Sequence, residues 1–243
     1  MNHRFSQKST LEEIRARFDG DVERFSRLET GQQATIDAPL VLELVAQVAA
    51  INLSPGGALL DLGCGAGNFT LSVLGSVSPL HCTLADLSQP MLDRARGRVE
   101  ATNVGGTVTT LQGDMRASDF ADGSFDVILA GAVLHHLRDD QDWEAMFGRL
   151  HRWLRPGGWL FVADLVTFDD PAVQNMAWQR YGQYLEALGG AEYRHKVFDY
   201  VDQEDSPRSL KYQLELLRST GFTDWDVLHR RSVFATYYGR KAS

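Results

Sequence analysis

The sequence has little of what marks secreted, membrane-spanning or disulfide-stabilised proteins. Only two of its 243 residues are cysteines, Cys64 and Cys82, and their surroundings are typical of a glycine-rich loop and a buried strand, so we expect no structural disulfide. No apolar run reaches the ~18 residues that a membrane span needs, and the first residues lack the apolar core of a secretory signal. These absences predict a cytoplasmic protein that does not cross a membrane.

The sequence also has no excess of basic residues. There are 24 Lys and Arg against 32 Asp and Glu, which gives a formal net charge of −8. A chain this acidic gains little non-specific attraction to phosphate backbones or anionic lipids. Nucleic acid is therefore disfavoured as a partner. RNA is still not excluded as an acceptor, because a local basic cluster lies near the C-terminal end: Arg230, Arg231, Arg240 and Lys241.

Short apolar runs alternate with longer amphipathic segments from about residue 57 to residue 166. This alternation predicts βαβ units and a doubly wound, mostly parallel α/β sheet covered by helices on both faces. Strands and helices are expected here at 58–62, 67–77, 82–86, 88–101, 108–112, 125–130, 142–154 and 159–166. Two further strands, at 224–228 and 232–238, are close in sequence and should pair antiparallel.

The segments on either side of this alternation are expected to be helical. Ser9 and Glu12 have the spacing of a capping box, which predicts a helix start there. Further helices are expected at 34–51, 171–188 and 207–220. We therefore divide the chain into an N-terminal helical cap or lid, residues 1–55, and a ligand-binding domain, residues 56–243, with a variable insertion at about 167–223.

The main functional motif is a glycine-rich loop after the first predicted strand. Gly63 and Gly65 allow the backbone to approach a ligand where side chains would collide. The glycine spacing differs from that of dinucleotide-binding loops, and Asp61 precedes the loop at the strand end. A carboxylate there would repel a pyrophosphate, which disfavours a nicotinamide dehydrogenase, and it suits a ligand that carries an ammonium and a sulfonium.

Two more acids follow the next two predicted strands. Asp86 is placed to accept both hydroxyls of a ribose, and Asp114 is placed to accept an adenine amino group. Met115 would pack on one side of the adenine ring, with Leu87 and Met91 on the other. A single aspartate at such a position more often caps a turn or a helix, but three at successive strand ends favour a binding site.

These motifs, at residues 60–67, 86–88, 113–115, 124–129 and 154–158, together resemble those of the class I S-adenosylmethionine (SAM)-dependent methyltransferases. The resemblance implies a seven-stranded Rossmann-like sheet with a reversed last strand, with SAM as cofactor and S-adenosylhomocysteine as product. It also implies that Ala130 and Gly131 face the methionine chain of SAM. The expected cofactor-binding residues are then Asp61, Gly63, Cys64, Gly65, Asp86, Leu87, Met91, Asp114, Met115, Ala130 and Gly131.

A weaker resemblance extends beyond the core motifs. The segment from Phe18 to Phe25 and the tail from residue 207 resemble the carboxy-SAM synthases of tRNA wobble-uridine modification. The glycine loop departs from that group, and Arg194 and Lys196 lie near the place of its carboxylate-binding arginine without a fixed register. Phe18 and Phe25 are expected either to belong to a lid over the pocket or simply to pack between helices.

The resemblance implies direct displacement, in which an acceptor atom attacks the SAM methyl, so no metal is required. If the acceptor must lose a proton, His135 is the candidate general base, with His136 beside it. The first choice of acceptor is a small molecule, recognised by residues 1–35 and 167–223. A carboxy-SAM synthase, a tRNA-directed enzyme and a non-catalytic SAM-binding protein remain alternatives, and homodimer formation is left open.

Overall fold

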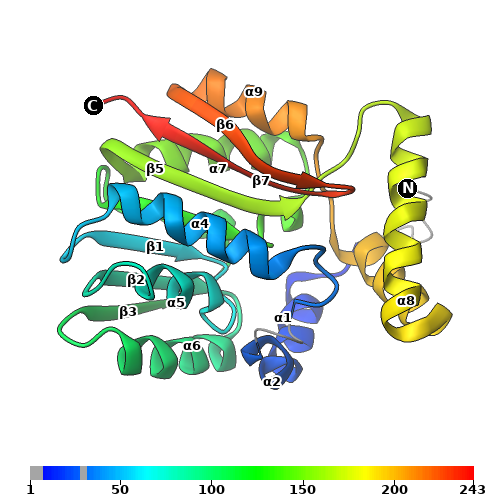
Figure 1. Cartoon of the computed structure of the whole chain (residues 1–243), viewed down its shortest axis with the longest axis horizontal. Helices are drawn as coiled ribbons and strands as arrows, with labels where there is room; N and C mark the ends of the chain where they lie inside the picture. Colours follow the sequence, from blue (N-terminus) through cyan, green and yellow to red (C-terminus); the bar gives the residue numbers. More distant parts are fainter. Residues whose placement is uncertain (1–7, 28–31) are drawn as a thin grey trace.

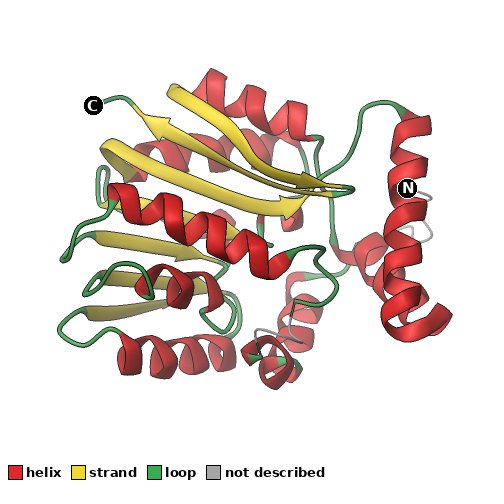
Figure 2. Ribbon diagram, viewed as in Figure 1, coloured by secondary structure: helices red, strands yellow, loops and turns green. Residues whose placement is uncertain are grey.

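The computed structural model of the chain describes residues 8–27 and 32–243. Helices and strands alternate through most of this range, as Figure 2 shows. The helices are α1 (Leu11–Gly20), α2 (Val22–Ser26), α4 (Ala38–Asn52), α5 (Asn68–Leu74), α6 (Gln89–Thr102), α7 (Asp140–Trp153), α8 (Pro171–Glu204) and α9 (Leu210–Thr220), with 3-10 turns η1 (Met115–Ala117) and η2 (Leu134–His136). The strands are β1 (Ala58–Leu62), β2 (His81–Asp86), β3 (Thr107–Gln112), β4 (Phe125–Gly131), β5 (Leu154–Leu165), β6 (Phe222–Arg231) and β7 (Phe234–Lys241).

The seven strands form one sheet in the order β3-β2-β1-β4-β5-β7-β6. Strands β1 to β5 pair in parallel, whereas β7 pairs antiparallel with both β5 and β6. The carboxyl ends of the parallel strands therefore meet along one edge of the sheet. In Figure 1, α1, α2 and α8 lie at that edge. The predicted fold class, a doubly wound sheet with a reversed last strand, is confirmed.

Helices cover the sheet on both faces. On one face, α4, α5 and α6 bury apolar side chains such as Val45, Val73 and Leu92 against β1, β2 and β4. On the other face, α7 and α9 bury a cluster that includes Trp143, Trp153 and Leu217. This double cover explains why the inner strands are apolar on both sides. It also makes the sheet a rigid base for the loops that follow its strands.

A third apolar cluster lies at the carboxyl edge, around α8. This helix is kinked at Gly189 and Gly190, and side chains before and after the kink, including Leu185 and Val197, share one core. Gly190 has φ of +78°, a conformation that glycine adopts without strain. The sequence placed the end of this helix at residue 188, at the kink, and did not predict the second half.

Several predicted boundaries differ from the structure. The capping box of α1 is made by Thr10 and Glu13, so its assignment to Ser9 and Glu12 is wrong by one residue. β5 begins at Leu154 rather than at the expected residue 159, because Leu154, expected at the end of a helix, already pairs with Phe125 of β4. Both cysteines are free and buried, and within the described residues no helix is long and apolar enough to cross a membrane.

Candidate functional site

A cavity lies at the carboxyl edge of the sheet, between the loops after β1 to β4 and the helices α1 and α2. It encloses about 1060 Å³, the part open to solvent included. Its walls are formed by Leu11, Ile14, Phe18, Phe25, Gln32, Leu62, Gly63, Cys64, Gly65, Ala66, Asn68, Phe69, Ala85, Asp86, Leu87, Met91, Gly113, Asp114, Met115, Arg116, Ser118, Gly131, Ala132, Val133, His136 and Arg138.

The glycine loop forms one wall with its backbone. The amides of Gly63 and Cys64 both donate to the carbonyl of Ala85, at 2.8 and 3.0 Å, which ties the loop to β2. Gly65 has φ of +50°, and a Cβ built on it meets no protein atom within 4 Å. The space beside Gly65 is therefore open for a ligand, as the glycine pattern predicted.

Asp86 connects the glycine loop to the start of α6. Its Oδ2 accepts from the Gly65 amide at 2.8 Å, and its Oδ1 accepts from the Ser88 amide at 2.9 Å. Each carboxylate oxygen has a second lone pair, so both remain able to accept a ribose hydroxyl. Burial raises the pKa of Asp86 in spite of these backbone hydrogen bonds.

Asp114 lies on the cavity wall after β3. Its carboxylate caps η1 through the amide of Arg116 at 3.0 Å and also pairs with the Arg116 guanidinium at 2.8 Å. Met115, Leu87 and Met91 line the same cavity, as predicted. The structure thus brings together the predicted adenosyl-binding residues that follow β2 and β3.

Two of the residues expected to bind the cofactor, Asp61 and Ala130, are not part of the cavity wall. Asp61 is 1% exposed and turns toward α5, where the Thr70 hydroxyl donates to its Oδ2 at 2.7 Å. Burial raises the pKa of Asp61 to about 6 although Thr70 hydrogen-bonds to it. Ala130 is enclosed in the apolar core, and the wall is made by the next residue, Gly131.

The helices α1 and α2 cover the open side of the cavity. Phe18 and Phe25 both line it, with ring centroids 5.8 Å apart. The Ser88 hydroxyl donates to Asp19 at 2.5 Å, and the Asn68 amide donates to the carbonyl of Phe25 at 3.0 Å. The two aromatics therefore line the cavity as well as packing between helices, and their helices are fastened to the N-terminal ends of α5 and α6.

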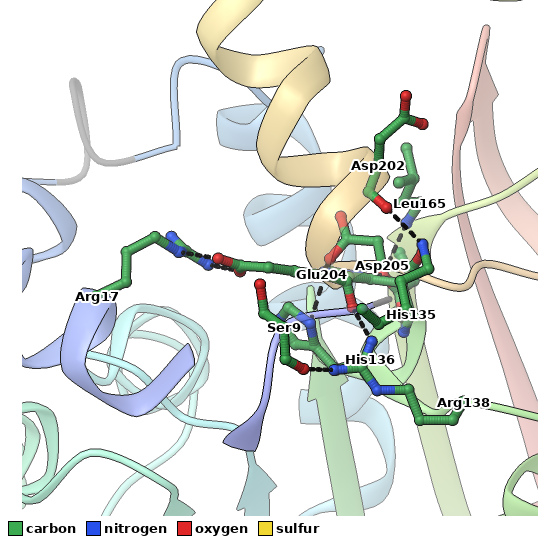
Figure 3. Close-up of polar contacts among 11 residues, drawn as sticks. Ser9, Arg17, His135, His136, Arg138, Leu165, Asp202, Glu204 and Asp205 are labelled. Atoms are coloured by element: carbon green, nitrogen blue, oxygen red, sulfur yellow. Dashed lines mark hydrogen bonds and ion pairs between the residues drawn. The ribbon is translucent and has the colours of Figure 1, made fainter. Parts of the chain in front are cut away.

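The far end of α8 fastens these helices on the other side. Arg17 makes a bidentate pair with Glu204, whose side chain is 6% exposed (Figure 3). Lys8 donates to the carbonyls of Asp202 and Asp205 at 2.7 and 2.5 Å. Lys8 thus satisfies carbonyls at the end of α8 that have no partner within the helix.

Arg138, which follows η2, connects the end of α8 to the segment before α1. Its guanidinium donates to the carbonyls of Glu204 and Ser9, both at 2.7 Å (Figure 3). The sequence did not identify this network, because its partners lie 66 to 197 positions apart. No local spacing signals such contacts.

The two histidines after β4 have different surroundings. His136 lines the cavity, with the ring of Phe18 packed edge-on against it at 5.8 Å between centroids. His135 does not line the cavity, which corrects its expected place, because its Nδ1 is bound by Asp164 at the end of β5. Burial alone would lower the pKa of His135, but the carboxylates of Asp164 and Asp205 raise it to about 9.

The insertion at 167–223, all of which the structure describes, adds no residue to the cavity wall, contrary to expectation. Tyr181 and Tyr184 instead donate to the carbonyls of Ala34 and Gln33. Arg194 pairs with Glu186 at 3.2 Å, outside the cavity. We call the part of the cavity wall formed by the turns after β1 to β4 the adenosyl wall. The wall opposite it comes from the other expected segment, residues 1–35, of which 1–7 and 28–31 lie outside the described residues.

Comparison with known proteins identifies related sequences and folds. Residues 59–158 match the family described as "Methyltransferase domain". The carboxy-S-adenosyl-L-methionine synthase of Wolinella succinogenes is 30% identical over 207 residues, which cover 83% of this chain and 84% of that protein. The corresponding synthase of Escherichia coli K12 is 25% identical over 208 residues, covering 83% and 82%.

Solved structures share the fold at low identity. The [4+2]-cyclase SpnF superposes with a TM-score of 0.66 and 18% identity, over 97% of both chains. A phosphoethanolamine N-methyltransferase of Haemonchus contortus, bound to S-adenosylhomocysteine, gives 0.65 and 14%, over 97% of this chain and 61% of that one. Since one of these proteins is a cyclase, the shared fold does not by itself specify a reaction.

Proposed function

Because the chain belongs to the class I SAM-dependent methyltransferases, with SAM as its cofactor, we propose that it transfers a methyl group to a small-molecule acceptor bound beneath α1 and α2. The observation that carries this proposal is the continuity of one cavity. The predicted adenosyl-binding residues and the apolar wall of α1 and α2 enclose the same space.

The residues of the cavity fit the cofactor. We propose that Gly63, Cys64 and Gly65 lie against its amino-acid end, with Asp86 at the ribose and Asp114 at the adenine. When bound, SAM supplies a methyl group already activated on a sulfonium. The protein therefore has to hold the acceptor close to that methyl group and exclude water.

The acceptor end of the cavity has mainly apolar walls. Leu11, Ile14, Phe18 and Phe25 from the covering helices face the loop after β4. Such a surface favours an acceptor with an apolar or aromatic body, because binding removes both surfaces from water. We propose that α1 and α2 act as the lid expected from the sequence.

The experiment follows the methyl group. The purified protein is incubated with isotope-labelled SAM and a cell extract separated into a small-molecule filtrate and a macromolecular fraction. Label transferred to a compound of the filtrate, together with formation of S-adenosylhomocysteine, is the expected result. Label found only in RNA or protein would contradict the proposal.

A second candidate is a carboxy-SAM synthase, and the relatives that match over most of the chain favour it. Arg116 and Arg138 are the arginines of the cavity wall, and Arg194 is not among them. Mass spectrometry of nucleosides released from the purified protein separates the two functions. A bound nucleoside heavier than SAM by a carboxyl group, with no label transferred, would replace methyl transfer with synthesis of carboxy-SAM.

We propose that the protein works in the cytoplasm, since its two buried thiols are unpaired. An RNA acceptor has less support, because the C-terminal basic residues make internal contacts. Arg231 pairs with Asp37 at 2.6 Å, and Lys241 donates to the carbonyls of His151 and Leu154. Arg230 lies over the ring of Phe168.

A further inference from the structure

Three nitrogen and oxygen atoms that can bind metals converge next to the cavity. His136 Nδ1 lies 3.2 Å from Asp205 Oδ1, and His135 Nε2 lies 3.7 Å from the same oxygen. All three atoms lie within 4.8 Å of one another. The two histidines come from η2, and Asp205 follows α8 (Figure 3).

Two of these atoms form an ion pair without a well-aligned hydrogen bond. His136 Nδ1 and Asp205 Oδ1 are buried and 3.2 Å apart, and neither meets hydrogen-bond geometry with a residue that the structure describes. They lie close enough to hydrogen-bond with each other, but their relative direction does not allow it. Buried polar atoms without partners are costly, so such a pair needs an explanation, and an unseen ion is one.

The separations suit ligands of one ion. Two ligand atoms at about 2.1 Å from a metal stand roughly 3–3.6 Å apart for angles of about 90–120°. The two distances to Asp205, 3.2 and 3.7 Å, are close to this range, whereas the distance between the two imidazole nitrogens is bounded only at 4.8 Å. Neighbouring ligands of one ion also point toward the ion rather than toward each other, which matches the failed hydrogen bond between His136 and Asp205.

The surroundings orient the histidines as in metal sites. Asp164 binds His135 Nδ1, and its Oδ2 also accepts from the His135 amide at 3.1 Å. This leaves His135 Nε2 facing Asp205, the arrangement by which a second carboxylate fixes a ligating imidazole. Asp205 itself is held in place by the helix end, since its amide donates to the carbonyl of Val201.

The charges around the cluster allow a cation. Asp205 belongs to the cluster and Asp164 contacts His135, so two carboxylates lie at the site, and Glu204 offsets the charge of the nearby Arg17. Arg17 is paired with Glu204, whereas Lys8 and Arg138 donate to backbone carbonyls. His136 reaches the cavity wall, so an ion can enter from the cavity.

We propose that His135, His136 and Asp205 bind a divalent first-row transition metal ion at the edge of the cavity. Two imidazoles and one carboxylate suit Zn²⁺, Fe²⁺ or Co²⁺ better than Mg²⁺ or Ca²⁺, which prefer oxygen ligands. Three protein ligands leave positions open toward the cavity for water or an acceptor oxygen. The ion displaces any proton that the imidazoles carry, and it would lower the pKa of a bound hydroxyl. The site does not depend on the proposed methyl transfer.

The test is a binding measurement on the whole chain. The protein is treated with a chelator, dialysed and titrated with Co²⁺, whose visible absorption reports coordination by nitrogen and oxygen. We expect one Co²⁺ per chain, competed by Zn²⁺. His136→Ala and Asp205→Asn should weaken Co²⁺ binding at least tenfold, and Asp164→Asn should weaken it about tenfold through the orientation of His135.

A second histidine–aspartate pair gives the matched control. His229 Nε2 lies 3.0 Å from Asp37, and neither residue lines the cavity or belongs to the cluster, so His229→Ala should leave Co²⁺ binding unchanged. His136→Ala decides the outcome if Asp205→Asn fails to fold, because the His136 ring stands at the cavity wall. Absence of stoichiometric Co²⁺ binding, or binding unchanged in His136→Ala, would overturn the proposal and leave the cluster as a proton-sharing ion-pair network.

Discussion

The two walls of the cavity are built in different ways. The adenosyl wall consists of turns that directly follow β1 to β4. It is joined by hydrogen bonds between neighbouring turns, such as those from the Gly63 amide to the Ala85 carbonyl and from the Gly65 amide to the Asp86 carboxylate. The opposite wall consists of α1 and α2, which are held by side chains from distant parts of the chain, such as Arg17 on Glu204.

This difference indicates a division of labour. The adenosyl wall inherits the rigidity of a sheet covered on both faces, so it is already shaped before a ligand binds. The opposite wall depends on a few ion pairs and cap contacts, which can break and reform at modest cost. A rigid cofactor wall and a movable cover suit a site that must admit two ligands and then exclude water.

The largest effect is expected from filling the tightest point of the adenosyl wall. In Gly63→Ala, the new Cβ would lie 2.2 Å from Val133 Cγ2, at a backbone φ of +70°. The loop must shift, and we expect SAM affinity to fall more than 100-fold in a calorimetric titration, about 2.7 kcal/mol or more.

Gly65→Ala separates loss of the ligand site from loss of the fold. Its Cβ meets no protein atom, and alanine at a φ of +50° costs only roughly 1–2 kcal/mol. The variant should therefore fold yet bind SAM more weakly, because the methyl group occupies cavity space. Gly97→Ala on α6 also has open space and should fold and bind normally. If Gly65→Ala binds SAM as well as Gly97→Ala does, the loop does not contact the cofactor.

The next effect concerns the acid that holds the loop. Asp86→Ala removes the acceptor of the Gly65 amide and the proposed partner of the ribose. SAM binding should weaken by roughly 2–3 kcal/mol, the cost of losing hydrogen bonds to a charged group. Asp93→Ala, on the exposed side of α6, is the matched control and should not change the affinity. Equal affinities in the two variants would remove Asp86 from the site.

The same difference between the walls explains what the sequence could predict. The glycine loop, Asp86, Asp114 and Met115 follow strands directly, so their positions come from local pattern and parallel topology together. Asp61 shows the limit of that reasoning: it has the right place along the strand, but its side chain points to the α5 face. Pattern and topology identify a strand end without specifying the neighbours of each side chain.

The network at the end of α8 was beyond local reasoning. Asp205 lies 69 positions from His136, and the kink at Gly189 and Gly190 that turns the second half of α8 back has no distinctive spacing. The sequence could not separate His135 from His136 as the residue facing the cavity, because both follow β4 directly. Only the position of Asp164 on β5 decides which of the two rings reaches the cavity.

A further prediction concerns the buried side of the adenosyl wall and uses pH. Burial raises the pKa of Asp61 from its ordinary 3.8 to about 6, so the folded protein holds this proton more tightly than the unfolded chain does. The stability that this proton contributes is complete below about pH 3.8 and is lost as the pH rises through 6. Urea unfolding without ligand should show a loss of about 2 kcal/mol over this window, absent in Asp61→Asn. Parallel pH profiles for the two proteins would contradict the assignment.

The smallest effect is expected on the movable wall. In the double variant Arg17→Met with Glu204→Gln, the pair between α1 and α8 is lost without leaving a buried charge, so stability should change little. The cover should open more often, and SAM should dissociate about tenfold faster in stopped-flow measurements, about 1.4 kcal/mol. The same change at the exposed pair of α1, Arg15→Met with Glu12→Gln, should alter dissociation less than about twofold, since exposed pairs contribute little. Equal dissociation rates in the two double variants would mean that α1 is not held over the cavity by Glu204, and that both walls are equally fixed.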